Sequence, residues 1–246
     1  MNETIKSLVN HRSIRKYASE DIAPDQLQAI VDAAQSAPSS IGGQQVSIIA
    51  IRDKDGKAKI SELAGNQPYI NQAPVFLLFC ADFNRARIAC DLNGEKLEVQ
   101  NCIESVLVGA VDVGISMGYA MAAAESLDLG TVCIGAIRSH PVEVAEFAGL
   151  PEYVFPVSGL VVGHPSDWSK LKPRLPRKAV FHEEKYDNKN MKKLIEEYDK
   201  QYFGYVDQRG GEPHTWTSKI AATYKQTYYH DVRKMLEKQG FKFGLN

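Results

Sequence analysis

Runs of apolar residues along the chain predict four β-strands. The runs cover residues 46–51, 75–81, 131–134 and 155–162. The second run is apolar at every position, which is typical of a strand that is covered on both faces. We therefore expect residues 75–81 in the centre of a sheet.

Apolar residues at helical spacing predict helices between these strands. Pro24 opens a helix in which apolar positions recur at i, i+3, i+4 and i+7 from Leu27. A further helix is expected near Ser139, as N-cap, and Pro141, in the first turn. The spacing also predicts helices over residues 3–9, 191–202 and, for the most part, 216–239.

Residues 106–124 form the longest apolar segment, interrupted by Asp112 and Ser116. This length is enough to cross a membrane, but an aspartate near the centre of a bilayer costs about 2.5–3.5 kcal/mol. The chain has no second segment of this kind. We therefore predict no membrane partner and a helix that is buried on every side. Small residues along it favour a dimer core: Gly109, Ala110, Gly114, Gly118 and Ala122.

The charge balance bears on the choice of partner. The 246 residues carry 29 Lys and Arg against 30 Asp and Glu, a net charge of −1, and 44% of them are hydrophobic. A chain of this length buries enough surface for one large domain or two small ones. Because the strong positive field that attracts nucleic acid is missing, we expect no nucleic-acid partner.

Cysteines and histidines form no metal-binding pattern in the sequence. Cys80, Cys90, Cys102 and Cys133 include no CxxC pair, and the six histidines are isolated from one another and from the thiols. We expect no metal site, and we expect each thiol to be a small buried hydrophobic residue. The first residues lack the apolar core of a secretory signal. We therefore expect a reduced, cytoplasmic protein.

Two basic segments are candidates for holding a phosphate group. Residues 11–16 include His11, Arg12, Arg15 and Lys16, and residues 170–178 carry five lysines and arginines around two prolines. The chain has neither a GxGxxG nor a P-loop motif, so side chains would have to bind such a group. Arginine suits this role because its planar guanidinium holds two phosphate oxygens at once. The alternative is that both segments are solvated basic surfaces.

A competing motif lies inside the long apolar segment. Gly114 to Gly118 match the GxSxG nucleophile elbow of α/β-hydrolases, with Ser116 as the nucleophile. Asp112 would then lie within a buried strand, and no HGG-type oxyanion loop precedes the motif. A serine esterase that uses Ser116 is therefore the alternative enzyme.

Several short motifs spread over nearly the whole chain match one family pattern. They are His11-Arg12-Ser13-Ile14-Arg15, Ser39-Ser40 with Gln44, Gly65 to Gln67, Phe79 to Asp82, Ala123 to Leu127 with Leu129-Gly130, Ile134-Gly135, and Leu171 to Pro176. Together they resemble the nitroreductase superfamily, in its branch of NADPH-dependent FMN oxidoreductases, which are oxygen-insensitive nitroreductases and NADPH-flavin oxidoreductases.

The resemblance implies an α+β, nitroreductase-like fold with a mixed, mostly antiparallel sheet wrapped by helices. The implied assembly is an intertwined homodimer about the long buried central helix, with FMN bound tightly but non-covalently at the subunit interface. Residues 1–246 would form a single domain. Within it, about 164–246 would be a basic loop and helical extension that covers the partner subunit and the active-site rim.

The resemblance also assigns residues to the cofactor. Those that would hold the FMN phosphate and ribityl chain are His11, Arg12, Ser13, Arg15, Lys172 and Arg174. Those that would contact the flavin or its tail are Ser39, Gln44 and Gln67. The strand end with Cys133, Ile134 and Gly135 would direct backbone N–H groups at the ring edge that bears O4 and N5.

Two further residues are assigned to substrates: Arg209 to the 2′-phosphate of NADPH, and Ile41 to the substrate pocket. Departures from the family pattern bear on these assignments. Cys133 stands where relatives often carry Tyr, and Tyr228-Tyr229-His230 stands where many have Ser-Arg-Pro. The missing arginine leaves the preference between NADPH and NADH open.

The implied activity is hydride transfer from NADPH or NADH through flavin N5 to nitroaromatics, quinones or free flavin, in a ping-pong cycle. Because FMN carries this chemistry, we expect no catalytic side chain, and small-molecule electron acceptors as partners. Besides the esterase, a non-catalytic flavin-binding module stays open as an alternative.

Overall fold

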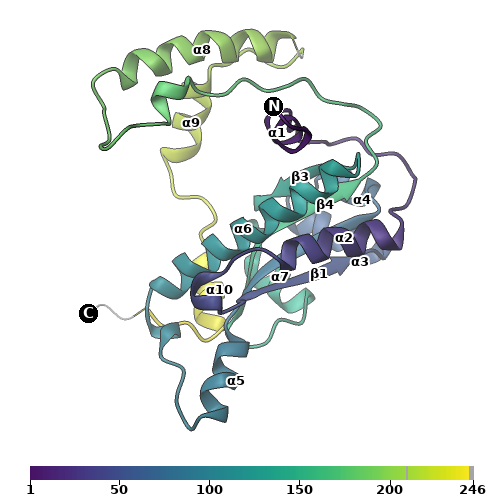
Figure 1. Cartoon of the computed structure of the whole chain (residues 1–246), viewed down its shortest axis with the longest axis vertical. Helices are drawn as coiled ribbons and strands as arrows, with labels where there is room; N and C mark the ends of the chain where they lie inside the picture. Colours follow the sequence, from purple (N-terminus) through teal and green to yellow (C-terminus); the bar gives the residue numbers. More distant parts are fainter. Residues whose placement is uncertain (209, 244–246) are drawn as a thin grey trace. The chain divides into compact units, whose positions relative to one another are not determined.

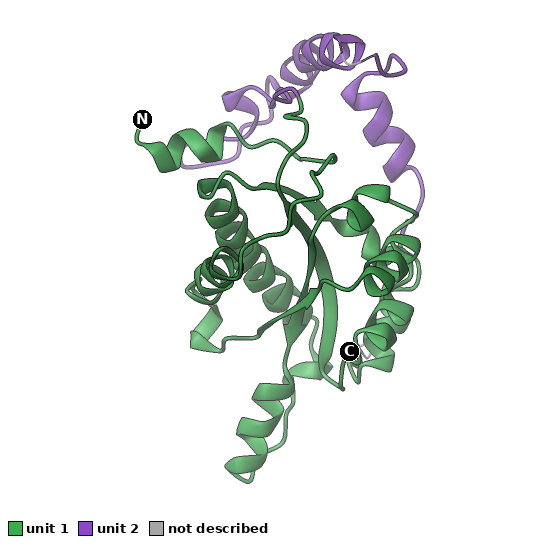
Figure 2. Ribbon diagram, turned by 90° about the vertical axis from the view of Figure 1, so that its right-hand side faces the viewer, with its two compact units in different colours: residues 1–169, 229–246 green, residues 170–228 purple. Residues whose placement is uncertain are grey.

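The computed structural model describes residues 1–208 and 210–243 and divides into two compact units. The first unit comprises Met1–Ser169 with Tyr229–Asn246, and the second Lys170–Tyr228 (Figure 2). The second unit contains most of the segment expected as a basic loop and helical extension. That the whole chain acts as one domain against a partner subunit stays a prediction.

A four-stranded antiparallel sheet forms the centre of the first unit (Figure 1). Its order is β1-β2-β4-β3, with β1 at Val46–Ile51, β2 at Val75–Asp82, β3 at Gly130–Ile134 and β4 at Val154–Gly163. All four predicted strands are confirmed, and β2 lies at an inner position as expected. The edge strands are β1 and β3.

Both faces of β2 are buried because its side chains alternate between two hydrophobic clusters. Leu77 and Phe79 pack in the cluster that includes α2 and α6, whereas Phe76 and Leu78 pack in the cluster that includes α3 and α4. Full burial of one such side chain contributes about 1.5–3 kcal/mol. The ring of Phe76 fills the space over β4 at Gly159, where a Cβ atom would lie 2.1 Å from it.

The helices of the first unit begin where the sequence provides a start signal. Asn2 caps α1 (Glu3–Val9), Pro24 opens α2 (Pro24–Gln35), and Asp53 caps α3 (Lys54–Leu63). The remaining helices are α4 (Pro68–Gln72), α5 (Asn84–Leu92), α6 (Glu104–Ser126), α7 (Pro141–Phe147) and α10 (Val232–Lys238). Short 3-10 turns lie at Ser40–Gly42, Val99–Asn101 and Gly135–Ser139.

Three details differ from the sequence expectations. Helix α5 was not predicted, because its apolar residues form no stripe and no side chain caps it. The N-cap of α7 is His140 rather than Ser139, since Ser139 belongs to the preceding 3-10 turn. The helix expected over 216–239 is two helices, α9 (Trp216–Tyr224) and α10, because Tyr229 between them adopts a left-handed conformation with φ 59°.

Helix α6 is confirmed as a helix, but the expectation that it is buried on every side is wrong for the single chain. Leu107 and Val111 are 60% and 51% exposed, and a Cβ atom at Gly114 or Gly118 would meet nothing within 4 Å. Within the described residues α6 is the helix long and apolar enough to cross a membrane, and 28% of its most apolar window is buried in the chain. Its inner face packs on α2 and β2.

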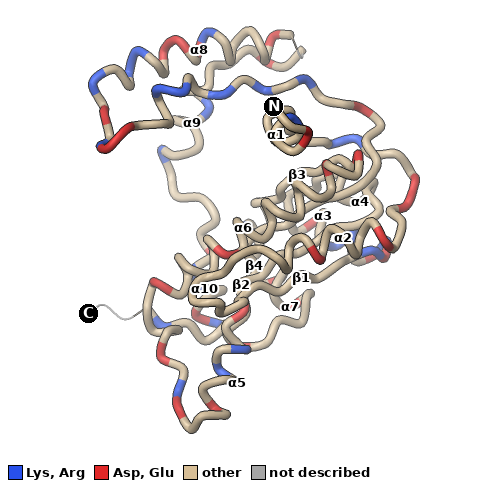
Figure 3. The backbone as a smooth tube through the Cα atoms, viewed as in Figure 1, with Lys and Arg blue, Asp and Glu red and all other residues tan. Residues whose placement is uncertain are grey.

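The second unit has a small aromatic core of its own. Tyr198, Tyr202 and Val206 of α8 (Met191–Gln208) pack with Leu175 and Trp216. The basic segment 170–178 is extended, as expected, up to a 3-10 turn at Arg177–Ala179. Figure 3 shows its lysines and arginines spaced along the chain before α8.

The expectation for the four thiols is correct in part. Cys80 is fully buried in the sheet, where burial raises its pKa to about 12. Cys90 is half-buried, and Cys102 and Cys133 are exposed, so these three do not follow the expectation. Cys102 precedes α6 and Cys133 lies on the edge strand β3, where the single chain provides no cover.

Candidate functional site

The N-terminal basic segment, residues 11–17, runs beside the free edge of β3. The backbone N–H of Ile14 donates to the carbonyl of Thr131 at 2.9 Å, and Ser13 forms a parallel bridge with Thr131. Ile14 and Tyr17 are buried, whereas Arg15 is exposed. The buried pair fixes the segment on the sheet and leaves the basic side chains between them at the surface.

Backbone alternation in β3 determines which groups are open beside this segment. Because the carbonyl of Thr131 points outward to Ile14, the next residue with outward N–H and C=O groups is Cys133. The backbone of Ile134 instead faces its ladder partner Gly159, and Gly135 begins a 3-10 turn. Of the three residues assigned to the ring edge, Cys133 therefore offers the outward backbone groups on the strand.

The Cys133 side chain lies close to α6. Its Sγ is 3.4 Å from the Sδ of Met121. Partial desolvation, and to a lesser extent the carboxylate of Glu125, raise the pKa of this thiol. Cys133 is therefore a neutral thiol at physiological pH.

The carboxylate of Glu125 contacts the imidazole of His11. Its Nδ1 lies 2.6 Å from Oε1 of Glu125, and Thr131 Oγ1 donates to the same oxygen at 2.9 Å. Both Glu125 and His11 are largely covered, with 12% and 23% of their side chains exposed. Glu125 comes from the last turn of α6, so three separate parts of the chain meet here.

Gln67 and Tyr69 lie close to the basic segment. The amide of Gln67 donates to the carbonyl of Ala64 at 2.7 Å and accepts from the hydroxyl of Tyr69. The Tyr17 hydroxyl donates to the carbonyl of Ile14 at 2.9 Å. Burial raises the pKa of Tyr17, against a lowering by Arg15 and with a smaller rise from Tyr69. Tyr69 packs against the cluster that contains Ile14 and Tyr17, so its hydrogen bond to Gln67 lies near the buried part of the segment.

The predicted flavin loop, residues 39–44, has an unusual backbone. Ile41 and Gln44 adopt left-handed φ angles of 50° and 49°, which is costly for a β-branched residue such as isoleucine. Ile41 is fully exposed, at 101%. A hydrogen bond across the loop supports this conformation: Ser39 Oγ accepts from the N–H of Gln44 at 3.0 Å.

Asp112 of α6 ties the same loop to the core. The Ser40 N–H lies 3.2 Å from each oxygen of its carboxylate, and Asp112 is 3% exposed. A cavity of about 570 Å³ lies beside the loop, with Arg85, Gln44 and Asp112 in its wall. The lone acid in the apolar segment therefore fixes the loop that carries Ile41.

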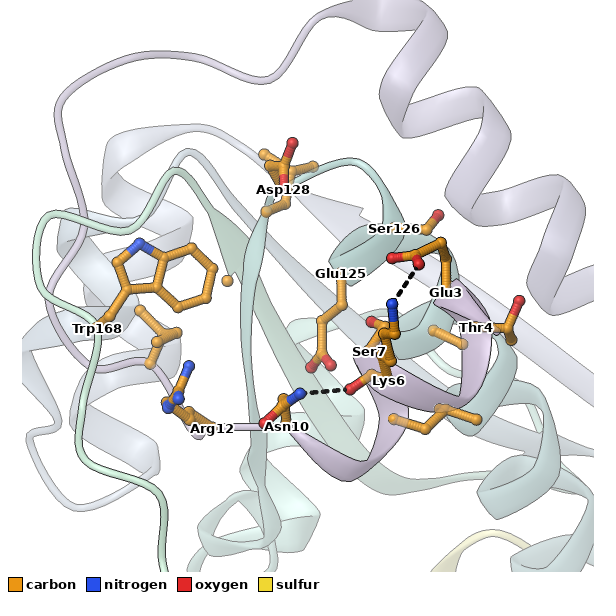
Figure 4. A pocket seen from close by; sticks show the side chains of 15 residues that line it. Glu3, Thr4, Lys6, Ser7, Asn10, Arg12, Glu125, Ser126, Asp128 and Trp168 are labelled. Carbon is orange, nitrogen blue, oxygen red and sulfur yellow. Dashed lines mark hydrogen bonds and ion pairs between the residues drawn. The ribbon is translucent and has the colours of Figure 1, made fainter. Parts of the chain in front are cut away.

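A second cavity, of about 430 Å³, lies next to the basic segment. It lies between α1, the end of α6 and Trp168. Figure 4 shows Arg12 at one side of it and Glu125 near Asn10, whose side chain donates to the carbonyl of Lys6 in α1. Arg12 is therefore one of the residues that line this cavity. No local motif in the sequence marks Trp168 as a lining residue.

Lys172 and Arg174 are exposed residues of the second unit. The Lys172 ammonium lies 5.3 Å from the centre of the Tyr202 ring, and the Tyr198 hydroxyl donates to the carbonyl of Pro173 at 2.9 Å. The aromatic core of this unit thus holds the basic segment in an extended shape. Arg209 lies outside the described residues.

Tyr229, one of the residues that depart from the Ser-Arg-Pro pattern, lies against Arg138. The guanidinium of Arg138 lies 5.3 Å from the centre of the Tyr229 ring and donates to the carbonyl of Val157 at 2.5 Å. Its Nη2 atom is also the nearest neighbour of Gly135, 3.0 Å from an ideal Cβ there. Arg138 therefore covers the strand end that the sequence assigns to the flavin edge.

The esterase alternative is wrong. Ser116 lies in the middle of α6, buried, and its hydroxyl donates to the carbonyl of Ala34 at 2.9 Å. A nucleophile elbow requires an exposed serine at a strand-to-helix turn. Among residues 1–208 and 210–243, no three His, Cys, Asp or Glu side chains are grouped as metal ligands.

Three residues of the candidate site were not assigned a role from the sequence. Glu125 and Arg138 carry no local signal, because their partners are distant in the chain or belong to its backbone. Asp112 did carry one, since it interrupts a long apolar segment.

Comparison with known proteins gives two family matches. The model of the nitroreductase family matches residues 8–164, and the model of the nitroreductase family, C-terminal domain, matches residues 172–244. The chain is 59% identical over 246 residues to an FMN reductase (NAD(P)H) of Bacillus subtilis, covering 98% of this chain and 99% of the relative. It is 38% identical over 244 residues to an oxygen-insensitive NADPH nitroreductase of Salmonella typhimurium, covering 98% and 99%.

Solved structures agree with these matches. The structure of NfrA2 from B. megaterium has a TM-score of 0.97 at 56% identity and covers 100% of both chains. The NADPH:FMN oxidoreductase from Vibrio harveyi, complexed with NAD+, has a TM-score of 0.87 at 34% identity and covers 97% of this chain and 98% of the other. The expected fold class is confirmed by these neighbours.

Proposed function

The chain belongs to the nitroreductase family, and from this premise we propose that it is an FMN-dependent NAD(P)H oxidoreductase of the flavin reductase and nitroreductase type. Relatives that match nearly its whole length are named FMN reductase, NADPH-flavin oxidoreductase and NADPH nitroreductase. The observation that carries the proposal is that the N-terminal basic segment, residues 11–17, is fixed along the edge of β3. There, cationic side chains and outward backbone groups lie within one short stretch.

The residues present fit FMN. A flavin needs a cationic site for its phosphate and hydrogen-bond donors along one edge of its ring. The segment supplies Arg12, Ser13 and Arg15 for the first, and the exposed edge of β3 at Cys133 supplies the second. Gln67, whose amide is already ordered by Ala64 and Tyr69, is proposed to contact the flavin or its tail.

FMN, when bound, would supply the redox chemistry that links oxidation of NADPH or NADH to reduction of a nitroaromatic, a quinone or free flavin in a ping-pong cycle. The chain's own residues bind and orient. We assign the segment's His11, Arg12, Ser13 and Arg15 to the phosphate and ribityl chain of FMN. We assign the N–H of Cys133 to the ring edge. The assignment of Lys172 and Arg174 to the phosphate is retained as part of the proposal. Arg138 places positive charge behind Gly135, which favours negative charge developing on a group at that edge.

Ser39, Ile41 and Gln44 lie before β1, at the edge of the sheet opposite to β3. We therefore propose that they form the rim over the flavin of the second copy in a dimer. The hydrogen bonds from Gln44 N–H to Ser39 and from Ser40 N–H to Asp112 hold this rim in a strained conformation. The fully exposed Ile41 then offers an apolar contact to a flat aromatic acceptor. The assignment of Arg209 to the 2′-phosphate of NADPH is retained as part of the proposal.

We further propose that the enzyme acts as a homodimer in the cytoplasm. The exposed stripe on α6, defined as Leu107, Val111, Gly114 and Gly118, follows helical spacing and is apolar. An exposed apolar patch of this kind marks a contact surface, and the glycines allow a second helix to approach closely. A second copy of α6 is the partner proposed for this stripe.

The visible spectrum of the purified protein tests the proposed function. We expect absorption bands of bound FMN, which bleach when NADPH or NADH is added under argon and return when an acceptor is added. The two nicotinamides are compared at equal concentration, and the rate ratio gives the preference. A yellow protein that neither nicotinamide bleaches would instead be a non-catalytic flavin-binding module, and a protein that takes up no FMN would refute both.

A further inference from the structure

Glu125 is a nearly buried carboxylate that no step of the proposed function uses. Its side chain is 12% exposed, and one of its oxygens accepts from two side chains, His11 and Thr131, at 2.6 and 2.9 Å. A carboxylate is kept in such a place only when it is well paired. The two donors satisfy that requirement.

The contact between Glu125 and His11 fixes the tautomer of the His11 ring. An ionised carboxylate can only accept hydrogen bonds, so the Nδ1 atom of His11 carries a proton. The remaining ring nitrogen, Nε2, is then on the opposite side of the imidazole, turned away from Glu125. A carboxylate behind a histidine commonly sets its ring orientation and tautomer in this manner.

The same carboxylate connects His11 to β3. Thr131 pairs with the basic segment through its backbone, since its carbonyl accepts from the Ile14 N–H at 2.9 Å, and through its side chain it donates to Glu125. Figure 4 shows Glu125 reaching from the end of α6 toward the part of the segment that carries Asn10 and Arg12. Glu125 thus links α6, β3 and the segment at one point.

We propose that Glu125 is a positioning residue that orients His11 toward the phosphate-bearing tail of FMN. This inference depends on the proposed function, because it takes the contact between His11 and FMN from there. Glu125 does not contact the cofactor. Its contribution is to hold the imidazole, so its effect is restricted to flavins that carry the group His11 contacts.

Titration of the FMN-free protein with FMN and with riboflavin, which lacks the phosphate, tests the proposal. We expect Glu125→Ala to weaken FMN binding about tenfold, the loss of one charge-assisted hydrogen bond, and riboflavin binding less than twofold. His11→Ala is expected to have the same effect. The double variant should be no weaker than His11→Ala alone, because Glu125 acts through His11.

Two variants separate positioning from general stability. Thr131→Val, which is isosteric, removes the other donor to the same carboxylate and should leave the FMN-to-riboflavin ratio unchanged. Glu125→Gln keeps an oxygen that can accept from Nδ1 and should restore most of the FMN affinity. Thermal unfolding of each variant checks that the fold is intact.

The outcomes are distinguishable. Equal loss of FMN and riboflavin affinity in folded Glu125→Ala, or additive effects of Glu125→Ala and His11→Ala, would overturn the positioning role. No effect of His11→Ala on FMN binding would overturn it as well. Failure of the wild-type protein to bind either flavin would instead count against the proposed function itself.

Discussion

Arg15 is the exposed cation of a segment whose neighbours, Ile14 and Tyr17, are buried. Its guanidinium donates a long hydrogen bond, 3.5 Å, to the Ser13 carbonyl, so the guanidinium is available to an anion. We expect Arg15→Ala to weaken FMN binding by about 1.5–3 kcal/mol, the value of a charge-assisted hydrogen bond. This corresponds to a loss of tenfold or more in FMN affinity, measured by fluorescence titration.

Lys16 provides a matched control for this variant. It is the adjacent exposed cation, but it forms an ion pair with Asp167 at 3.1 Å. Lys16→Ala should change FMN affinity less than twofold. Equal effects of the two variants would mean that FMN responds to the general charge of the segment and not to Arg15.

Cys133 gives a prediction for pH dependence. Because its pKa is raised, less thiolate is present at pH 7–8 than for a free cysteine, and the thiolate is the reactive form. We expect alkylation of Cys133 by iodoacetamide to be slow at neutral pH and to accelerate as the pH rises above the usual cysteine range. Peptide mass spectrometry measures the rate at this site.

Bound FMN should protect the same thiol. If the flavin edge lies against β3, alkylation of Cys133 in the loaded protein is slower than in the FMN-free protein, while the exposed Cys102 reacts equally in both. Unchanged reactivity of Cys133 would place the flavin away from this strand.

Helix α6 has an inner face that packs within the chain and an outer face that is exposed. Gly109 on its inner face lies against the sheet, where a Cβ atom would be 2.7 Å from that of Ala81, whereas Gly114 meets nothing within 4 Å. The first glycine is thus required by the fold of one chain. Gly114 is not required by the fold of one chain, and its lack of a side chain matters only for a contact with another molecule.

Placing a charge on the exposed stripe tests what covers it. We expect Val111→Glu to leave the helix content and the fold of the chain unchanged, because Val111 is 51% exposed. It should weaken self-association at least tenfold, since it buries an unpaired charge in the contact. Sedimentation velocity over a range of concentrations measures this change.

Lys54→Glu serves as the control for Val111→Glu. Lys54 is exposed on α3, whose cluster covers the other face of the sheet from that of α6. It should sediment as the wild type does. A Val111→Glu protein that still sediments as a dimer would exclude the stripe as the contact.

At the scale of the whole molecule, the sequence predicts the regular parts better than the site. Short apolar runs predict all four strands, and the run that is apolar at every position marks β2, which is buried along its whole length. Helix α5 and the break before α10 were missed because they have no cap, stripe or breaking residue. The left-handed φ angles of Ile41 and Gln44 were not predictable either, because tertiary contacts impose them against local preference.

In the candidate site, too, local features could be predicted and long-range contacts could not. Its basic segments and motifs are local in the chain and could be recognised. The contacts that organise them join residues 114 positions apart at His11 and Glu125, and 72 apart at Ser40 and Asp112. A single sequence contains no signal for such pairs, since each member alone is an ordinary polar residue.

The hydrogen bond between Asp112 and the Ser40 N–H connects the supply of flavin to the assembly of the enzyme. It joins the loop proposed to cover the flavin to the helix proposed to hold two copies together, so ordering of either one favours the other. Such coupling is reciprocal: a ligand that tightens the loop also tightens the pair, by the same free energy. A cell short of vitamin B2 would then contain fewer assembled enzymes as well as fewer loaded ones.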